Sequence, residues 1–127
     1  IKFRAWDTKR MHYPTKIEIL PEGINCDDTL GIPDKYLMVW TGLLDFKGKE
    51  IFEGDVLRSS RHKDLAVVEW SELGHWVRVP ISLKKGWVGF NMTDGQDGID
   101  PDMKLHYQEV IGNLYEHPEL LTGGAGA

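Results

Sequence analysis

The chain has 127 residues, of which 41% are hydrophobic and 28% are charged, and its formal net charge is −5. This length and composition are typical of one soluble globular domain with its own hydrophobic core. The negative balance argues against a strongly basic nucleic-acid binder, although it leaves room for a local basic patch.

Cysteine usage and the lack of long apolar runs bear on the compartment. Cys26 is the single cysteine, so no intrachain disulfide can form, and a reducing cytoplasm fits. A nucleophilic cysteine needs an activating neighbour, so an inert thiol is the favoured interpretation. No apolar run is long enough for a transmembrane helix, and the first residues, IKFRAWD, lack the apolar core of a signal peptide. We therefore expect a cytoplasmic protein that does not contact the membrane.

Short runs of β-branched and aromatic residues between turn residues predict strands along most of the chain. The expected strand segments, in chain order, are 1–7, two pieces within 11–20, 35–41, 55–60, 65–70, 75–81, 87–92 and 108–116. The segment 35–41 is apolar enough to be buried on both faces. Residues 21–34 and 93–102 are rich in Gly, Pro and Asp and are expected to be loops. Helix is expected only as a weak candidate around 27–37 and as a turn at 119–122.

Many short strands joined by tight turns favour a mainly β fold. A small barrel or roll is expected, because closure removes unpaired strand edges. We expect one domain over residues 1–121, with a barrel core at about 36–116 and extra strands before it. Residues 122–127 (TGGAGA) have little to pack and are expected to form a frayed tail.

Residues 41–57, TGLLDFKGKEIFEGDVL, invite comparison with a phosphate-binding loop. Such a loop needs two glycines separated by four residues, then Lys and Ser or Thr, and a helix. Here five residues separate Gly42 from Gly48, Glu50 stands where the hydroxyl should be, and no helix is predicted. Asp and Gly instead suit a tight turn over residues 45–48, and residues 53–55 suit a second one. The stretch is predicted to set strand register.

The same region carries the strongest family resemblance in the chain. Residues 36–57, YLMVWTGLLDFKGKEIFEGDVL, resemble the signature of the YopX family of phage and prophage proteins. The opening IKFRAWD, the middle VVEW at 67–70 and the closing EVIGNLYEHPELL at 109–121 are similar to that family too. The two loop regions, 21–34 and 93–106, lie outside the pattern.

The resemblance implies a mainly β fold with an SH3-type barrel, and an origin in phages or prophages, including those of gut bacteria. It implies no catalytic residues, because the family's molecular function is uncharacterised. The glycines, aspartates and aromatics of the motifs are interpreted as architectural.

Other clusters of reactive residues do not fit a known site. The five histidines lack metal-ligand spacing, and one cysteine cannot make a thiolate set. Neither register of the acidic loop at 93–102 matches a calcium-binding loop, so a solvated loop is favoured over an irregular cation site. Carboxylates and serines show no catalytic arrangement. We expect no cofactor and no enzyme activity.

Basic residues cluster around the central hairpins, and tryptophans lie among them. Small barrels can bind ligands by stacking on such rings and by cation–π contacts. The candidate binding surface consists of Arg58, Arg61, Lys63, Trp76 and Arg78. Trp76 and Arg78 share one strand face by the period of two. The competing interpretation, which aromatic composition favours, is that the tryptophans fill the core and the cations are solvated.

Two hypotheses for function are therefore open. The first is a non-catalytic interaction or assembly module that binds a protein partner or itself through strand edges or aromatic patches. The second is a nucleic-acid-binding barrel that uses the basic and aromatic face. An enzyme acting on a small molecule ranks behind both.

Overall fold

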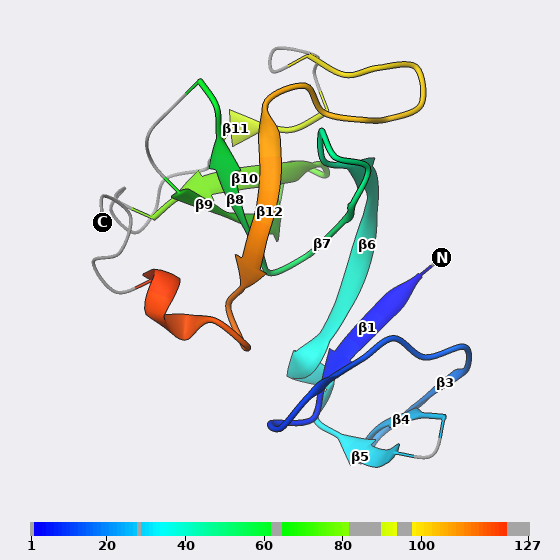
Figure 1. Ribbon diagram of the computed structural model, residues 1–127. Helices are drawn as coiled ribbons and strands as arrows, with labels where there is room; N and C mark the ends of the chain where they lie inside the picture. The colour runs from blue at the N-terminus through cyan, green and yellow to red at the C-terminus, as the bar shows by residue number, and fades with distance from the viewer. Residues whose placement is uncertain (1, 28, 62–64, 82–89, 94–97, 122–127) are drawn as a thin grey trace. The chain divides into compact units, whose positions relative to one another are not determined.

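Figure 1 shows the computed structural model, which describes residues 2–27, 29–61, 65–81, 90–93 and 98–121. Strands dominate these residues, as the sequence predicts, and their curled sheets fit a small mainly β barrel. The chain divides into two compact parts, an N-terminal unit (Ile1–Trp40) and a C-terminal unit (Thr41–Ala127). The SH3 type and the single domain over residues 1–121 stay predictions, and the expected tail at 122–127 lies outside the described residues.

The N-terminal unit contains two groups of antiparallel strands. β1 (Phe3–Trp6) pairs with β2 (Met11–His12) and with the first residues of β6 (Leu37–Leu44). A three-stranded sheet follows in the order β3 (Ile17–Leu20), β4 (Gly23–Cys26) and β5 (Thr29–Ile32). The expected strand positions within 1–7, 11–20 and 35–41 are therefore confirmed.

The loop predicted at residues 21–34 is wrong, because it contains β4 and β5. The Gly and Asp residues that suggested a loop belong, together with Asn25, to the β-hairpins of this sheet. Asp27 accepts hydrogen bonds from the backbone N–H groups of Thr15 and Lys16, and Asn25 accepts one from Gly31. Ile24 and Cys26 alternate with these polar residues and belong to a small core. That core consists of Ala5, Ile24, Cys26 and Ile32.

The helix expected around residues 27–37 is also wrong, apart from one short turn. The 3₁₀-helix η1 covers Asp34–Tyr36 and has no side-chain cap. The strand β5 takes up most of the segment that the helix was expected to occupy.

The C-terminal unit begins with the two turns predicted in residues 41–57, and both are confirmed. The Gly48 N–H donates to the Asp45 carbonyl at 2.9 Å, and Gly48 has φ +86°. Gly54, also at φ +86°, turns the chain from β7 (Glu50–Phe52) into β8 (Asp55–Ser59). Both glycines adopt the left-handed conformation that a Cβ atom disfavours.

The main sheet of this unit has the strand order β11-β10-β9-β8-β12. Its strands after β8 are β9 (Leu65–Trp70), β10 (Trp76–Pro80), β11 (Phe90–Asn91) and β12 (Gln108–Asn113). The strands predicted over 55–60, 65–70, 75–81, 87–92 and 108–116 are confirmed within the described residues. β12 ends three residues early because Asn113 Oδ1 accepts the N–H groups of Tyr115 and Glu116 and so starts a turn. The 3₁₀-helix η2 (Pro118–Leu121) follows.

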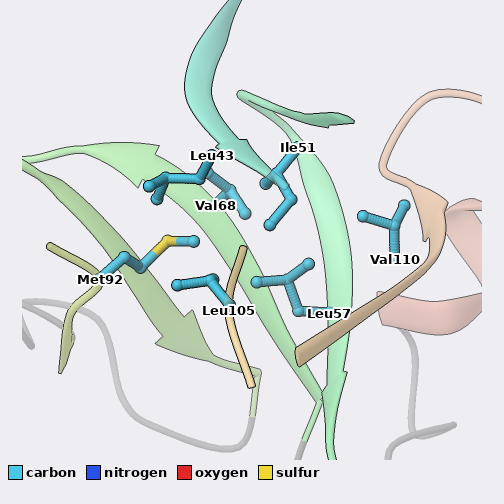
Figure 2. Packing of buried hydrophobic residues seen from close by; sticks show 7 residues of the cluster. All are labelled: Leu43, Ile51, Leu57, Val68, Met92, Leu105 and Val110. Atoms are coloured by element: carbon cyan, nitrogen blue, oxygen red, sulfur yellow. The ribbon is translucent and has the colours of Figure 1, made fainter. Parts of the chain in front are cut away.

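Figure 2 shows the core of the C-terminal unit, in which seven apolar side chains from distant parts of the sequence meet. They are Leu43, Ile51, Leu57, Val68, Met92, Leu105 and Val110. Burial on both faces of β6, which the sequence suggested, is only partial. Met38 and Leu43 are buried, whereas the other residues of that strand are half-buried.

Candidate interaction surfaces

Strand register decides which of the predicted surface residues share a face. Trp76 lies opposite Trp70, and Arg78 lies opposite Val68, in the antiparallel pair β9–β10. Opposed residues point to the same face of a sheet, as do residues two apart. Trp76 and Arg78 therefore share a face, as predicted, and that face also carries Val68 of the core.

Of these two tryptophans, Trp76 is partly buried and Trp70 is exposed. Trp76 packs against the core cluster. Trp70 is 55% exposed and meets Trp76 edge to face, with the ring centroids 5.0 Å apart. Leu73, in the turn that joins the two strands, is 73% exposed. The end of the β9–β10 hairpin thus presents two large apolar side chains to solvent.

Arg78 lies in the interior of the unit. Arg78 is 5% exposed, and its guanidinium carbon lies 4.6 Å from the Phe90 ring centroid. Register explains the contact, because Arg78 lies directly opposite Phe90. A buried cation on a ring supports packing, so Arg78 does not add charge to an open surface.

Arg58 lies on the opposite face of the sheet from Trp76 and Arg78. Leu57 is paired with Ala66 and faces the core, whereas Arg58 is paired with Leu65 and faces outward. The structure therefore divides the predicted set into two groups. Lys63 lies outside the described residues.

Arg58 and Arg61 belong to a second surface, which we call the basic surface. It consists of Lys47, Arg58, Arg61, Tyr107 and Glu109. Lys47 Nζ and Arg58 Nη2 bind the Glu109 carboxylate at 2.7 and 2.8 Å. These hydrogen bonds and the two positive charges hold the pKa of Glu109 below its usual range. The Arg61 guanidinium lies 4.8 Å from the Tyr107 ring centroid. Two cations bind one carboxylate and a third lies on the Tyr107 ring, so the surface carries local positive charge on an acidic chain.

Sequence reasoning missed Lys47, Tyr107 and Glu109. Tyr107 and Glu109 are two residues apart at the last strand, which was a usable signal for a shared face. Lys47 gave no such signal, because its position depends on how the turn at residues 45–48 meets β12. The backbone N–H of Phe46, next to Lys47, donates to the Gln108 carbonyl at 3.0 Å.

Among the described residues, no group of three or more His, Cys, Asp or Glu side chains is arranged to hold a metal ion. His106 Nε2 and Asp100 Oδ1 form one hydrogen-bonded pair next to the acidic loop, while Asp94 and Asp97 lie outside the described residues. Neither of the helical segments in that part of the chain has the length and apolar character to cross a membrane.

Comparison with known proteins identifies the family. A family model described as YopX protein matches residues 2–122. The chain belongs to the YopX family. This YopX-family chain is similar to the crystal structure of protein EF1440 from Enterococcus faecalis, with 28% identity, a TM-score of 0.56, and coverage of 94% of this chain and 96% of that one.

A second solved structure supports the same fold. YopX from Bacillus subtilis matches with a TM-score of 0.53 at 23% identity, covering 96% of each chain. The names of these two proteins state no activity. A search of curated proteins found no match.

Proposed function

We propose that this YopX-family chain is a phage- or prophage-encoded, non-catalytic module that binds a protein partner in the bacterial cytoplasm. The observation that carries the proposal is the exposed end of the β9–β10 hairpin, where Trp70 is 55% exposed beside Trp76. Because Trp76 packs on the core, the Trp70 ring is held before any partner arrives. Rigid, exposed tryptophans are enriched among residues that dominate binding energy.

Leu73 extends this apolar surface. Its exposed side chain belongs to a turn held by hydrogen bonds, because the Ser71 N–H donates to the His75 carbonyl at 2.9 Å and the Gly74 N–H to the Ser71 carbonyl at 2.9 Å. Ser71 Oγ also accepts the N–H of Leu73 at 3.0 Å. A fixed turn loses little conformational freedom on binding, which favours affinity.

Cross-linking in bacterial cells that carry the phage or prophage tests this proposal. A tagged wild-type chain is expected to capture a defined partner, and Trp70→Ser to reduce its yield at least tenfold. Arg61→Ser, an exposed change on the basic surface, is the matched control and is expected to keep the partner. Equal capture by Trp70→Ser and wild type would overturn the proposal.

Nucleic-acid binding is a second candidate, favoured by the basic surface. Arg58 and Lys47 are 59% and 62% exposed, and Arg61 rests on the Tyr107 ring. Cations next to aromatic rings suit a single strand, whose phosphates pair with the charges and whose bases stack. The buried position of Arg78 removes it from this site.

Fluorescence anisotropy with labelled single-stranded DNA and RNA tests the second candidate. Binding at low salt should weaken steeply as salt rises. Arg58→Ser combined with Arg61→Ser should abolish it, and Glu109→Gln should strengthen it, because that change removes the carboxylate among the cations. Binding that is absent at low salt, or unchanged by the double variant, would contradict this candidate.

A further inference from the structure

Three segments of the C-terminal unit meet at the end of the main sheet where β9 finishes. The Gly54 N–H donates to the Val68 carbonyl at 2.9 Å, and the Leu114 N–H donates to the Gly54 carbonyl at 3.0 Å. These two bonds join the turn after β7, the last residues of β9 and the turn after β12. The β9–β10 hairpin, with its exposed apolar side chains, therefore lies next to the other two segments.

The segments that meet here carry carboxylates and no Lys or Arg. Residues 51–55, 68–77 and 112–121 contain neither basic residue. Apart from the buried Asp55, the acidic residues of these segments are Glu53, Glu69, Glu72, Glu116 and Glu119. Glu53 is half-buried, and the other four are exposed. We call these five residues the acidic end, because they give this end of the sheet a negative potential.

The basic surface lies at the other end of the same strands. Arg58 pairs with Leu65, the first residue of β9, whereas Trp70 is the last residue of that strand. The extended chain between Leu65 and Trp70 spans about 16 Å. This is roughly twice the Debye length of about 8 Å at physiological salt. The cation of Arg58 therefore does little to offset the negative potential around Trp70.

The Trp70 ring can bind a cation. Trp76 meets this ring edge to face and covers at most one of its two faces, and Trp70 is 55% exposed. Among aromatic side chains, indole binds cations best. Glu69 and Glu72 flank Trp70 in the sequence, and the exposed Leu73 follows them. The end of the hairpin thus combines apolar contact area, a ring for a cation and negative charge.

We propose that the partner of the β9–β10 hairpin is a basic protein segment, in which Arg or Lys side chains lie next to apolar ones. Its apolar side chains cover Trp70 and Leu73, while its cations stack on the Trp70 ring and pair with the carboxylates of the acidic end. The same carboxylates repel phosphates, so nucleic acids and anionic lipid surfaces do not fit here. This inference rests on the proposed function and adds the chemistry of the partner.

Fluorescence anisotropy of the full chain with two labelled peptides of equal length tests the inference. One peptide alternates Leu with Arg, and the other alternates Leu with Glu. The Leu-Arg peptide is expected to bind at least about tenfold more tightly, and its affinity should fall as salt rises. Glu69→Gln combined with Glu72→Gln should weaken its binding at least about threefold. Glu109→Gln, the same chemical change on the basic surface, is the matched control and should not weaken it.

Three results would overturn the inference: no binding of the Leu-Arg peptide, equally tight binding of the Leu-Glu peptide, or wild-type affinity in the double variant. The two glutamates of the double variant are exposed, so the variant is expected to fold like the wild type.

Capture of the partner in cells separates this inference from the proposed function. If Trp70→Ser and the double variant both lose the partner, both proposals are supported. If Trp70→Ser loses the partner and the double variant keeps it, the hairpin binds a protein without using its carboxylates, and only the present inference fails. If Trp70→Ser keeps the partner, the proposed function itself fails.

Discussion

Each of the two units contains an aspartate that accepts backbone hydrogen bonds, but the two aspartates lie in different environments. In the N-terminal unit, Asp27 organises an exposed loop next to a small apolar core. In the C-terminal unit, Asp45 is 1% exposed and lies beside a larger core. Water can replace an exposed carboxylate as a hydrogen-bond acceptor. Such a carboxylate therefore stabilises the fold less than one whose hydrogen-bond partners are buried. Buried polar bonds therefore stabilise the C-terminal unit in addition to its apolar packing.

The largest effect is expected from Asp45→Ala. Its Oδ1 accepts the N–H groups of Lys47 and Lys49, and its Oδ2 accepts the Val110 N–H at 3.0 Å. Alanine would leave all three donors without that partner, and the free energy of unfolding should fall by about 4 kcal/mol. Urea denaturation measures the change.

Asp45→Asn is the control for that experiment. It keeps one acceptor oxygen at the same place and should lose clearly less stability than Asp45→Ala. Equal losses for the two variants would show that packing, rather than the hydrogen bonds, sets the role of this side chain.

A smaller loss is expected in the N-terminal unit from Ile24→Ala. Ile24 is fully buried, and its truncation to alanine leaves a cavity. The free energy of unfolding should fall by about 3 kcal/mol. Ile19→Ala, on the exposed edge of the same sheet, is the matched control and should lower the free energy of unfolding by well under 1 kcal/mol. Thermal or urea unfolding distinguishes the two variants.

Cys26 reports whether the units open together. It is buried in the small core, and burial together with the nearby Asp27 charge raises the pKa of its thiol. Labelling by a thiol reagent near pH 8 should be at least about a hundredfold slower than in urea. Ile24→Ala should increase the rate at which Cys26 is labelled. If Asp45→Ala speeds labelling equally, the units open as one; an unchanged rate would show that they open separately.

The pH dependence of the Asp7 turn provides a more modest test. Hydrogen bonds from His12 and from the backbone N–H groups of Arg10 and Lys9 hold the pKa of Asp7 well below its usual range. A depressed carboxyl pKa stabilises the fold above the unfolded value of about 4, and this contribution fades as the pH falls below it. The Tm gap between wild type and Asp7→Asn should therefore narrow below about pH 4. A gap that widens there would contradict the assignment.

The smallest effect on stability is expected from Glu109→Gln. The cations that bind Glu109 are more than half exposed, and solvent screens such ion pairs. The Tm should change little, in contrast to Asp45→Ala on the same side of β12. A large drop in Tm would show that the ion pairs on this surface are structural.

Local chemistry accounts for what the sequence predicted well. The turn at residues 45–48 follows from Asp at its start and Gly at its end, and β9 follows from its run of β-branched residues. The loop prediction for residues 21–34 was wrong because Gly, Pro and Asp indicate loops even where they lie at the ends of short hairpin strands. The division of the candidate surface could not be predicted, because it depends on the register between β8, β9 and β10. The burial of Arg78 likewise depends on its pairing with Phe90.

The bond between Asp45 and Val110 spans 65 residues of sequence. During synthesis the Asp45 turn leaves the ribosome before β12, and its two local hydrogen bonds can form at once. Its second carboxylate oxygen finds its partner only when Val110 of β12, 65 residues later in the sequence, emerges. Contacts of such separation are slow to form, so closure at β12 is expected to be a late step in folding. A nascent chain that stalls before residue 110 would thus carry a preformed turn without its final partner.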